Sequence, residues 1–270
     1  MEEEQLWEVC PAENKPKDKR LEKLPKYLPK LPATFYVLGG CGSGKSSFLW
    51  SILSNGYITG KKKKSVFDEC IFYLGTLDSK SAFEKLPIEN LLILDEFDPV
   101  MFEAYQNDLK THQMEKLSEG KAPLNTLLVF DDFVNGGLMK KARQNTSPPI
   151  EKLALTSRHE SNCSIFFCSQ VYRNSGFSQP SVRNNITTFV VYRMSRVELE
   201  KICEELCEMY DPDELLEHFD KAFARDSYNF LVLDRRRPIG TDRWTEKLSK
   251  PLPPSKKFLE MEALRKVGKL

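Results

Sequence analysis

Eight residues near the start of the chain, from Gly39 to Ser46, have the types and spacing of a loop that binds phosphate groups. They read GGCGSGKS and match the pattern G-x-x-x-x-G-K-[ST]. Glycines let backbone N–H groups turn toward an anion, Lys45 supplies a positive charge, and the hydroxyl of Ser46 is a ligand for Mg²⁺. The pattern predicts a site for a nucleotide and Mg²⁺. The residues predicted to contact the nucleotide are Gly39, Gly40, Cys41, Gly42, Ser43, Gly44, Lys45, Ser46 and Ser47.

The elements around this loop predict an α/β fold. An apolar stretch at 34–38 precedes the loop, and a run with helical composition at 46–53 follows it. Farther along, apolar runs predict further strands, which are separated by predicted helices; the strands are at 65–74, 127–130, 164–169, 187–192 and 228–234. This alternation favours a mostly parallel sheet with helices on both faces. Ligands of such sheets bind at the carboxyl ends of the strands, where the loop would lie.

Two segments offer the acidic residue that a phosphate loop needs to hold Mg²⁺. Residues 91–96 read LLILDE and residues 127–132 read LLVFDD, so in both segments paired acids follow four apolar residues. The first segment leads directly into a predicted helix, where an aspartate is also expected as a capping residue. We therefore favour Asp131 as the metal-binding acid, with Asp95 and Glu96 as the alternative pair.

The strand after the favoured segment supports this choice. In ATPases with such a loop, that strand commonly carries a polar residue that senses the γ-phosphate, and Gln170 ends the run SIFFCSQ. Gln170 is therefore the predicted sensor. Asp132, next to the metal-binding acid, is the predicted base that orients the attacking water.

Five motifs occur along the chain in a fixed order: GGCGSGKSS at 39–47, LLVFDDF at 127–133, SRH at 157–159, SIFFCSQ at 164–170 and RNNI at 183–186. In this combination the chain resembles the DNA-packaging ATPases of poxviruses and other nucleocytoplasmic large DNA viruses, which are shared with virophages and Polinton-type transposons. Those proteins belong to the FtsK–HerA superfamily. The resemblance implies a RecA/FtsK–HerA-like P-loop NTPase fold, with ATP as the nucleotide.

The same resemblance implies a DNA motor. Its expected activity is ATP hydrolysis coupled to translocation of double-stranded DNA without sequence preference, in order to package a viral genome. Its expected partners are further copies of itself in a homo-oligomeric ring, together with capsid or other virion proteins. The implied location is soluble and intracellular, at the assembly site in the host cytoplasm or in the virion.

In such rings an arginine from the neighbouring subunit completes the site and contributes roughly 10³–10⁵ in rate. Arg158, in the turn before the strand at 164–169, matches the family position best, followed by Arg183 and then Arg173. Each could instead be a surface arginine in a salt bridge. The chain departs from the superfamily pattern at Asp132, where cellular members usually have Glu. The shorter side chain of aspartate needs a closer water.

Two other functions fit a phosphate loop. One is a kinase of a nucleoside or another small molecule, which would need an arginine-rich lid that the segments between the strands do not offer. The other is a nucleotide-binding assembly protein that does not hydrolyse its ligand. Hydrolysis measured with and without DNA separates these functions from a DNA motor.

Composition limits the remaining possibilities. The chain has 270 residues, 40% hydrophobic and 29% charged, with a net charge of +1, which suits one large α/β domain. The expected divisions are a Lys/Pro-rich tail at 1–32, an ATPase domain at 33–240 and a basic tail at 241–270. Basic runs at 61–64 and 235–237 are candidates for DNA contact or are solvated turns.

Cysteine usage and hydropathy predict a soluble protein with reduced thiols. Seven cysteines without close CxxC spacing, and only three histidines, leave few ligands for zinc. The first residues lack the basic and apolar regions of a signal peptide, and no apolar run approaches the length that spans a bilayer.

Overall fold

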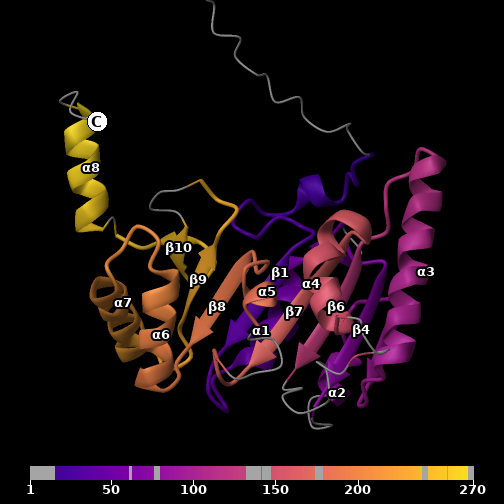
Figure 1. Ribbon diagram of the computed structural model, residues 1–270, viewed down its shortest axis with the longest axis horizontal. Helices are drawn as coiled ribbons and strands as arrows, with labels where there is room; N and C mark the ends of the chain where they lie inside the picture. Colours follow the sequence, from indigo (N-terminus) through magenta and orange to yellow (C-terminus); the bar gives the residue numbers. More distant parts are fainter. Residues whose placement is uncertain are drawn as a thin grey trace, which may run out of the picture.

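The computed structural model describes residues 16–60, 63–75, 80–131, 141, 147–173, 179–238, 243–253 and 255–266. In these residues the chain forms a nine-stranded sheet in the order β11-β10-β9-β8-β1-β7-β6-β4-β5, with helices on both faces, and a separate two-stranded ribbon, β2-β3 (Figure 1). The strands are β1 (Thr34–Leu38), β2 (Ile58–Thr59), β3 (Lys64–Ser65), β4 (Glu69–Leu74), β5 (Leu91–Leu94), β6 (Thr126–Asp131), β7 (Cys163–Ser169), β8 (Thr188–Tyr192), β9 (Phe230–Asp234), β10 (Trp244–Glu246) and β11 (Lys250–Pro251). The helical segments are η1 (Leu21–Lys23), α1 (Lys45–Ser51), the π-helical turn η2 (Ile52–Gly56), α2 (Lys80–Phe83), α3 (Pro99–Ser118), α4 (Pro149–Glu160), α5 (Pro180–Arg183), α6 (Arg196–Leu206), α7 (Pro212–Arg225) and α8 (Lys256–Lys266).

The sheet is mostly parallel, as the alternation of strands and helices predicts. Strand β1 pairs in parallel with β7 on one side and β8 on the other, and β7, β6, β4 and β5 continue the parallel order. The carboxyl ends of β1, β6, β7 and β8 therefore lie along one edge. A strand buried on both faces reads as an unbroken apolar run, and every residue of β1 is buried.

Two hydrophobic cores lie on the opposite faces of the sheet. Alternate residues of β1 divide between them, with Tyr36 and Leu38 in one core and Phe35 and Val37 in the other. Helices α3, α4, α6 and α7 contribute to the first core, whereas α1, η2 and α2 contribute to the second. The phosphate loop therefore leads from a fully buried strand into a helix that is packed on the second face.

The sheet extends past the expected domain boundary at residue 240. Strands β9 and β10 pair in antiparallel fashion, and β10 brings Trp244 into the first core with no exposed surface. The indole ring packs edge-on against Phe219 at 5.8 Å, and its N–H donates to the carbonyl of Leu206 at 3.2 Å. This indole anchors residues that lie in the range expected to be a tail. Helix α8 then stands away from the sheet (Figure 1).

The N-terminal segment packs on the domain as a strap over residues 16–32. Leu28 is buried in the second core. Two arginines beyond β9 hold the strap's backbone, because Arg236 donates to the carbonyl of Pro32 at 2.8 Å and Arg237 to that of Tyr27 at 3.0 Å. The basic run at 235–237 is a candidate for DNA contact. Two of its side chains, Arg236 and Arg237, instead bind backbone carbonyls of the same chain.

Two further observations concern the sequence-based expectations. Within the described residues, no helix combines the length and the apolar character needed to cross a membrane. The cysteines seen in this part of the chain are free thiols, most of them buried, with Cys41 exposed in the phosphate loop.

Candidate functional site

The phosphate loop lies between the ends of three neighbouring strands. It follows β1 and leads into α1. The N–H of Gly39 donates to the carbonyl of Ser169 at the end of β7, at 3.1 Å, and the N–H of Gly40 donates to the carbonyl of Arg193, just after β8, at 3.0 Å. The loop is therefore fastened on both sides to the sheet edge where ligands of α/β proteins bind.

Three glycines are needed where the structure places them. Gly42 and Gly44 have φ values of +69° and +104°, a region that disfavours residues with a side chain. A Cβ atom on Gly39 would lie 2.4 Å from the Oγ of Ser43 and 2.6 Å from the Cβ of Tyr192. The side chains of Ser43 and Tyr192 thus occupy the space that a side chain at position 39 would need.

This close packing gives a first testable prediction. Replacing Gly39 with Ala should destabilise the protein by about 1–3 kcal/mol and weaken nucleotide binding, because the added methyl group overpacks the loop. Gly40→Ala is the matched control, since its Cβ would have the carbonyl oxygen of Arg193 at 3.6 Å as its nearest neighbour. Thermal denaturation and ATP titration of both variants check the prediction. Equal effects of the two substitutions would contradict it.

Hydrogen bonds hold the side chains of both Lys45 and Ser46 in place. The ammonium group of Lys45 donates to the carbonyls of Gly39 and Gly40 at 2.9 and 3.2 Å, and only 5% of this residue is exposed. Its charge is thus held inside the concave loop. The Oγ of Ser46 donates to Oδ2 of Asp131 at 2.9 Å, which joins two motifs that are 85 residues apart in the chain.

Asp131 ends β6 and is 5% exposed. Strand β7 lies between β6 and β1, and Asp131 is level with Cys168 on β7. A hydroxyl and a carboxylate side by side are the hard oxygen ligands that Mg²⁺ prefers, and Mg²⁺ typically uses one or two carboxylates together with water and phosphate oxygens. The residues present therefore fit Mg²⁺ at this position.

The alternative acidic pair lies elsewhere. Asp95 and Glu96 are exposed after β5, which is the edge strand at the far side of the sheet. Asp98 accepts hydrogen bonds from the N–H groups of Val100 and Met101 at 2.7 and 3.0 Å, so it caps α3. The geometry thus brings Asp131, and not Asp95, to the hydroxyl of Ser46.

Gln170 directly follows β7, the strand between the loop and Asp131. Its preceding residue, Ser169, accepts the hydrogen bond from Gly39, and the side chain of Gln170 is exposed. This position is compatible with a sensor of the γ-phosphate. Asp132, the predicted base, lies outside the described residues.

Arg158 is far from the loop of its own chain. It lies in the last turn of α4, and not in the turn before β7 as expected, because the helix continues to Glu160. Its charge is close to that of Arg236, which binds the carbonyl of Pro32 just before β1. Arg158 is thus near the amino ends of the parallel strands. Strand β7 has seven residues, so its amino end lies roughly 20 Å from the loop at the carboxyl ends of the strands.

The other two arginine candidates are held within the chain. Arg183 forms an ion pair with Glu205 at 3.0 Å and its guanidinium lies over the ring of Tyr172 at 5.4 Å. Arg173 pairs with the same glutamate at 3.4 Å. Burial opposes the charged form of Glu205, but hydrogen bonds from Arg183 and Arg173 lower its pKa below the usual value, so it remains charged.

Two residues beside the loop were not singled out from the sequence. Tyr192 ends β8 and is buried, and Tyr228 precedes β9 and is 65% exposed. A Cβ on Gly44 would be 3.5 Å from the ring of Tyr192 and 3.6 Å from that of Tyr228. The sequence gives little indication that these tyrosines belong to the site, because an aromatic residue near the end of a strand is most often part of the core.

Similarity to known proteins appears at the level of the fold. No protein-family model and no curated protein sequence matches the chain. Among solved structures it is similar to B204, the DNA-packaging ATPase from Sulfolobus Turreted Icosahedral Virus, with a TM-score of 0.52 and 19% identity over 83% of this chain and 99% of that chain. It is also similar to the cytoplasmic domain of the Type VII secretion ATPase EccC of Thermomonospora curvata, with a TM-score of 0.50 and 14% identity over 83% of this chain and 26% of that chain. Together with the loop and the parallel sheet, these similarities show that the chain has the α/β fold of P-loop NTPases.

Proposed function

We propose that the chain is an ATPase that translocates double-stranded DNA and packages a viral genome into a capsid. The observation that carries the ATPase proposal is the 2.9 Å hydrogen bond between Ser46 and Asp131. In P-loop NTPases, the hydroxyl of this loop and an acid on a neighbouring strand together hold Mg²⁺ at the β- and γ-phosphates. Here both groups are in place at the carboxyl edge of the sheet.

Each residue of the site has a defined task in this proposal. Lys45 and the loop N–H groups bind the phosphates, and Ser46 and Asp131 orient the metal. When bound, Mg²⁺ neutralises charge that develops on the transferred phosphoryl group. Asp132 orients the attacking water, and Gln170 transmits the state of the γ-phosphate to the loops at this edge.

Support for a DNA motor comes from three observations. The motif set resembles that of viral packaging ATPases, and one protein of similar fold is itself a DNA-packaging ATPase. Arg158 lies at the edge of the sheet opposite its own loop, so a catalytic role requires a neighbouring subunit, as in a homo-oligomeric ring. The further partners in this proposal are capsid or other virion proteins, at the viral assembly site in the host cytoplasm.

ATP hydrolysis by the purified chain, with and without linear double-stranded DNA, tests this function. We expect DNA to stimulate hydrolysis, and we expect the stimulation to fall steeply with salt concentration because phosphate contacts release counterions. Lys45→Ala should abolish hydrolysis, whereas Lys121→Ala, a change of an exposed lysine paired with Glu119, should not.

Two outcomes would contradict the proposal. Transfer of phosphate to a nucleoside, without stimulation by DNA, would identify a kinase. Packaging and hydrolysis unchanged in Lys45→Ala would show that the loop has a structural role only.

A further inference from the structure

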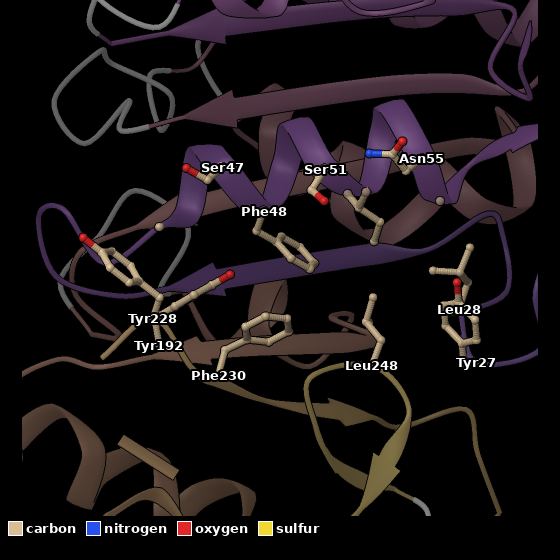
Figure 2. A pocket seen from close by; sticks show the side chains of 13 residues that line it. Tyr27, Leu28, Ser47, Phe48, Ser51, Asn55, Tyr192, Tyr228, Phe230 and Leu248 are labelled. Atoms are coloured by element: carbon tan, nitrogen blue, oxygen red, sulfur yellow. The ribbon is translucent and has the colours of Figure 1, made fainter. Parts of the chain in front are cut away.

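A groove of about 440 Å³ runs along α1 and η2 beside the phosphate loop. Figure 2 shows Ser47, Ser51 and Asn55 along the helix on one side of it, with Tyr228, Tyr192, Phe230 and Leu248 on the other side. The groove begins at Gly44, inside the loop, so it is continuous with the predicted phosphate site.

The strand order determines which end of a bound nucleotide this groove faces. The order β9-β8-β1-β7-β6 places Asp131 on one side of the loop and the strands carrying Tyr192 and Phe230 on the other. Ser46 turns toward Asp131, whereas the next residue, Ser47, lines the groove. The metal and the γ-phosphate belong on the side of Asp131. The nucleoside end of the same ligand must therefore leave the loop on the side of the groove.

The groove beside the loop has an aromatic wall. Tyr192 and Phe230 are 4.9 Å apart between ring centroids, and Phe48 of α1 meets Phe230 edge-on at 5.3 Å. Tyr228 lies at the end of the groove nearest Gly44 and is 65% exposed, and a Cβ atom built on Gly44 would lie 3.6 Å from its ring. An exposed aromatic ring next to a phosphate site offers a π-face to a planar base.

We propose that Tyr228 stacks on the base of the nucleotide whose phosphates bind the loop, with Tyr192 and Phe230 as the apolar wall of a base pocket. This inference rests on the proposed function as far as nucleotide binding is concerned. The proposed base pocket is only the end of the groove near Gly44, because a single ribose separates the base of a nucleotide from its phosphates. The far end, lined by Tyr27 and Leu248, is not part of the pocket.

The test compares ATP with inorganic tripolyphosphate, both titrated with Mg²⁺ into the full chain. Base–aromatic stacking predicts that Tyr228→Ala weakens ATP binding by about 5- to 150-fold. Tripolyphosphate carries no base, so its affinity should be unchanged. Tyr228→Phe keeps the ring and should bind ATP as the wild type does. Tyr27→Ala, a change of another exposed tyrosine at the far end of the same groove, is the matched control and should leave both affinities unchanged.

Each contrary outcome has a distinct meaning. Unchanged ATP affinity in Tyr228→Ala would overturn the stacking proposal and leave the phosphate site intact. Equal weakening of ATP and tripolyphosphate would also overturn it, because the tyrosine would then support the loop and not the base. A wild-type protein that binds neither ligand would overturn nucleotide binding itself, and the stacking proposal with it.

Discussion

Asp131→Asn is expected to lower the kcat of ATP hydrolysis by at least about 100-fold, with a higher concentration of Mg²⁺ needed for half-maximal activity. Asparagine has nearly the same shape, so its Oδ1 can still accept the hydrogen bond from Ser46. What the substitution removes is the negative charge that attracts the metal. Asp131 is the one acidic residue in β6, which reads TLLVFD, so no other carboxylate of that strand can replace it.

Asp95→Asn is the matched control for this prediction. Both aspartates follow an apolar strand of the same sheet, but Asp95 is exposed after the edge strand β5. Steady-state hydrolysis over a range of Mg²⁺ concentrations should be unchanged in Asp95→Asn. A loss of activity in Asp95→Asn, together with normal Mg²⁺ dependence in Asp131→Asn, would exchange the roles of the two segments.

Arg158→Ala is expected to lower hydrolysis by about 10³-fold while leaving ATP affinity within a few-fold of the wild type. The reason is geometric, since Arg158 lies near the amino ends of the strands and the loop lies at their carboxyl ends. An arginine in that position is too far from its own loop to act there, so its proposed role is at the site of the next subunit. Head-to-tail contacts of this kind generate rings when the rotation closes.

A mixing experiment separates this role from a structural one. In a mixture of Arg158→Ala and Lys45→Ala subunits, some intact loops face a neighbour that still carries Arg158. We expect the mixture to hydrolyse ATP faster than the sum of the two variants measured separately. Arg183→Ala and Arg173→Ala serve as comparisons, because both side chains already pair with Glu205. Absence of recovery, or recovery only with Arg183→Ala, would exclude Arg158.

The features that could be predicted from the sequence are local ones. The loop pattern depends on spacing within eight residues, and the long helix at 99–118 is marked by Pro99 and by the cap at Asp98. Buried strands have unbroken apolar runs. These runs predict the bounds of the central strands to within a residue or two. The order of these runs was enough to predict a mostly parallel α/β sheet.

What the sequence did not predict depends on contacts between distant segments. The strand expected at 65–74 is divided, because the N–H of Phe67 binds the Oγ of Ser65 and Asp68 pairs with Arg20 of the N-terminal strap. The antiparallel strand at Trp244 depends on a partner, β9, that its own short sequence does not reveal. The aromatic wall is hidden for the same reason, since Tyr192 and Tyr228 are far apart in the chain and only the fold brings both rings beside Gly44.

The central claim is that the loop at 39–46 and Asp131 form a single Mg²⁺–nucleotide site. An experimental structure of the chain with Mg²⁺ and a non-hydrolysable ATP analogue tests it most directly. We expect the metal to contact the Oγ of Ser46 and to lie beside the carboxylate of Asp131, with the phosphates in the loop and Lys45 on the β- and γ-phosphates. A metal at Asp95 and Glu96, or an analogue bound outside the loop, would contradict the claim.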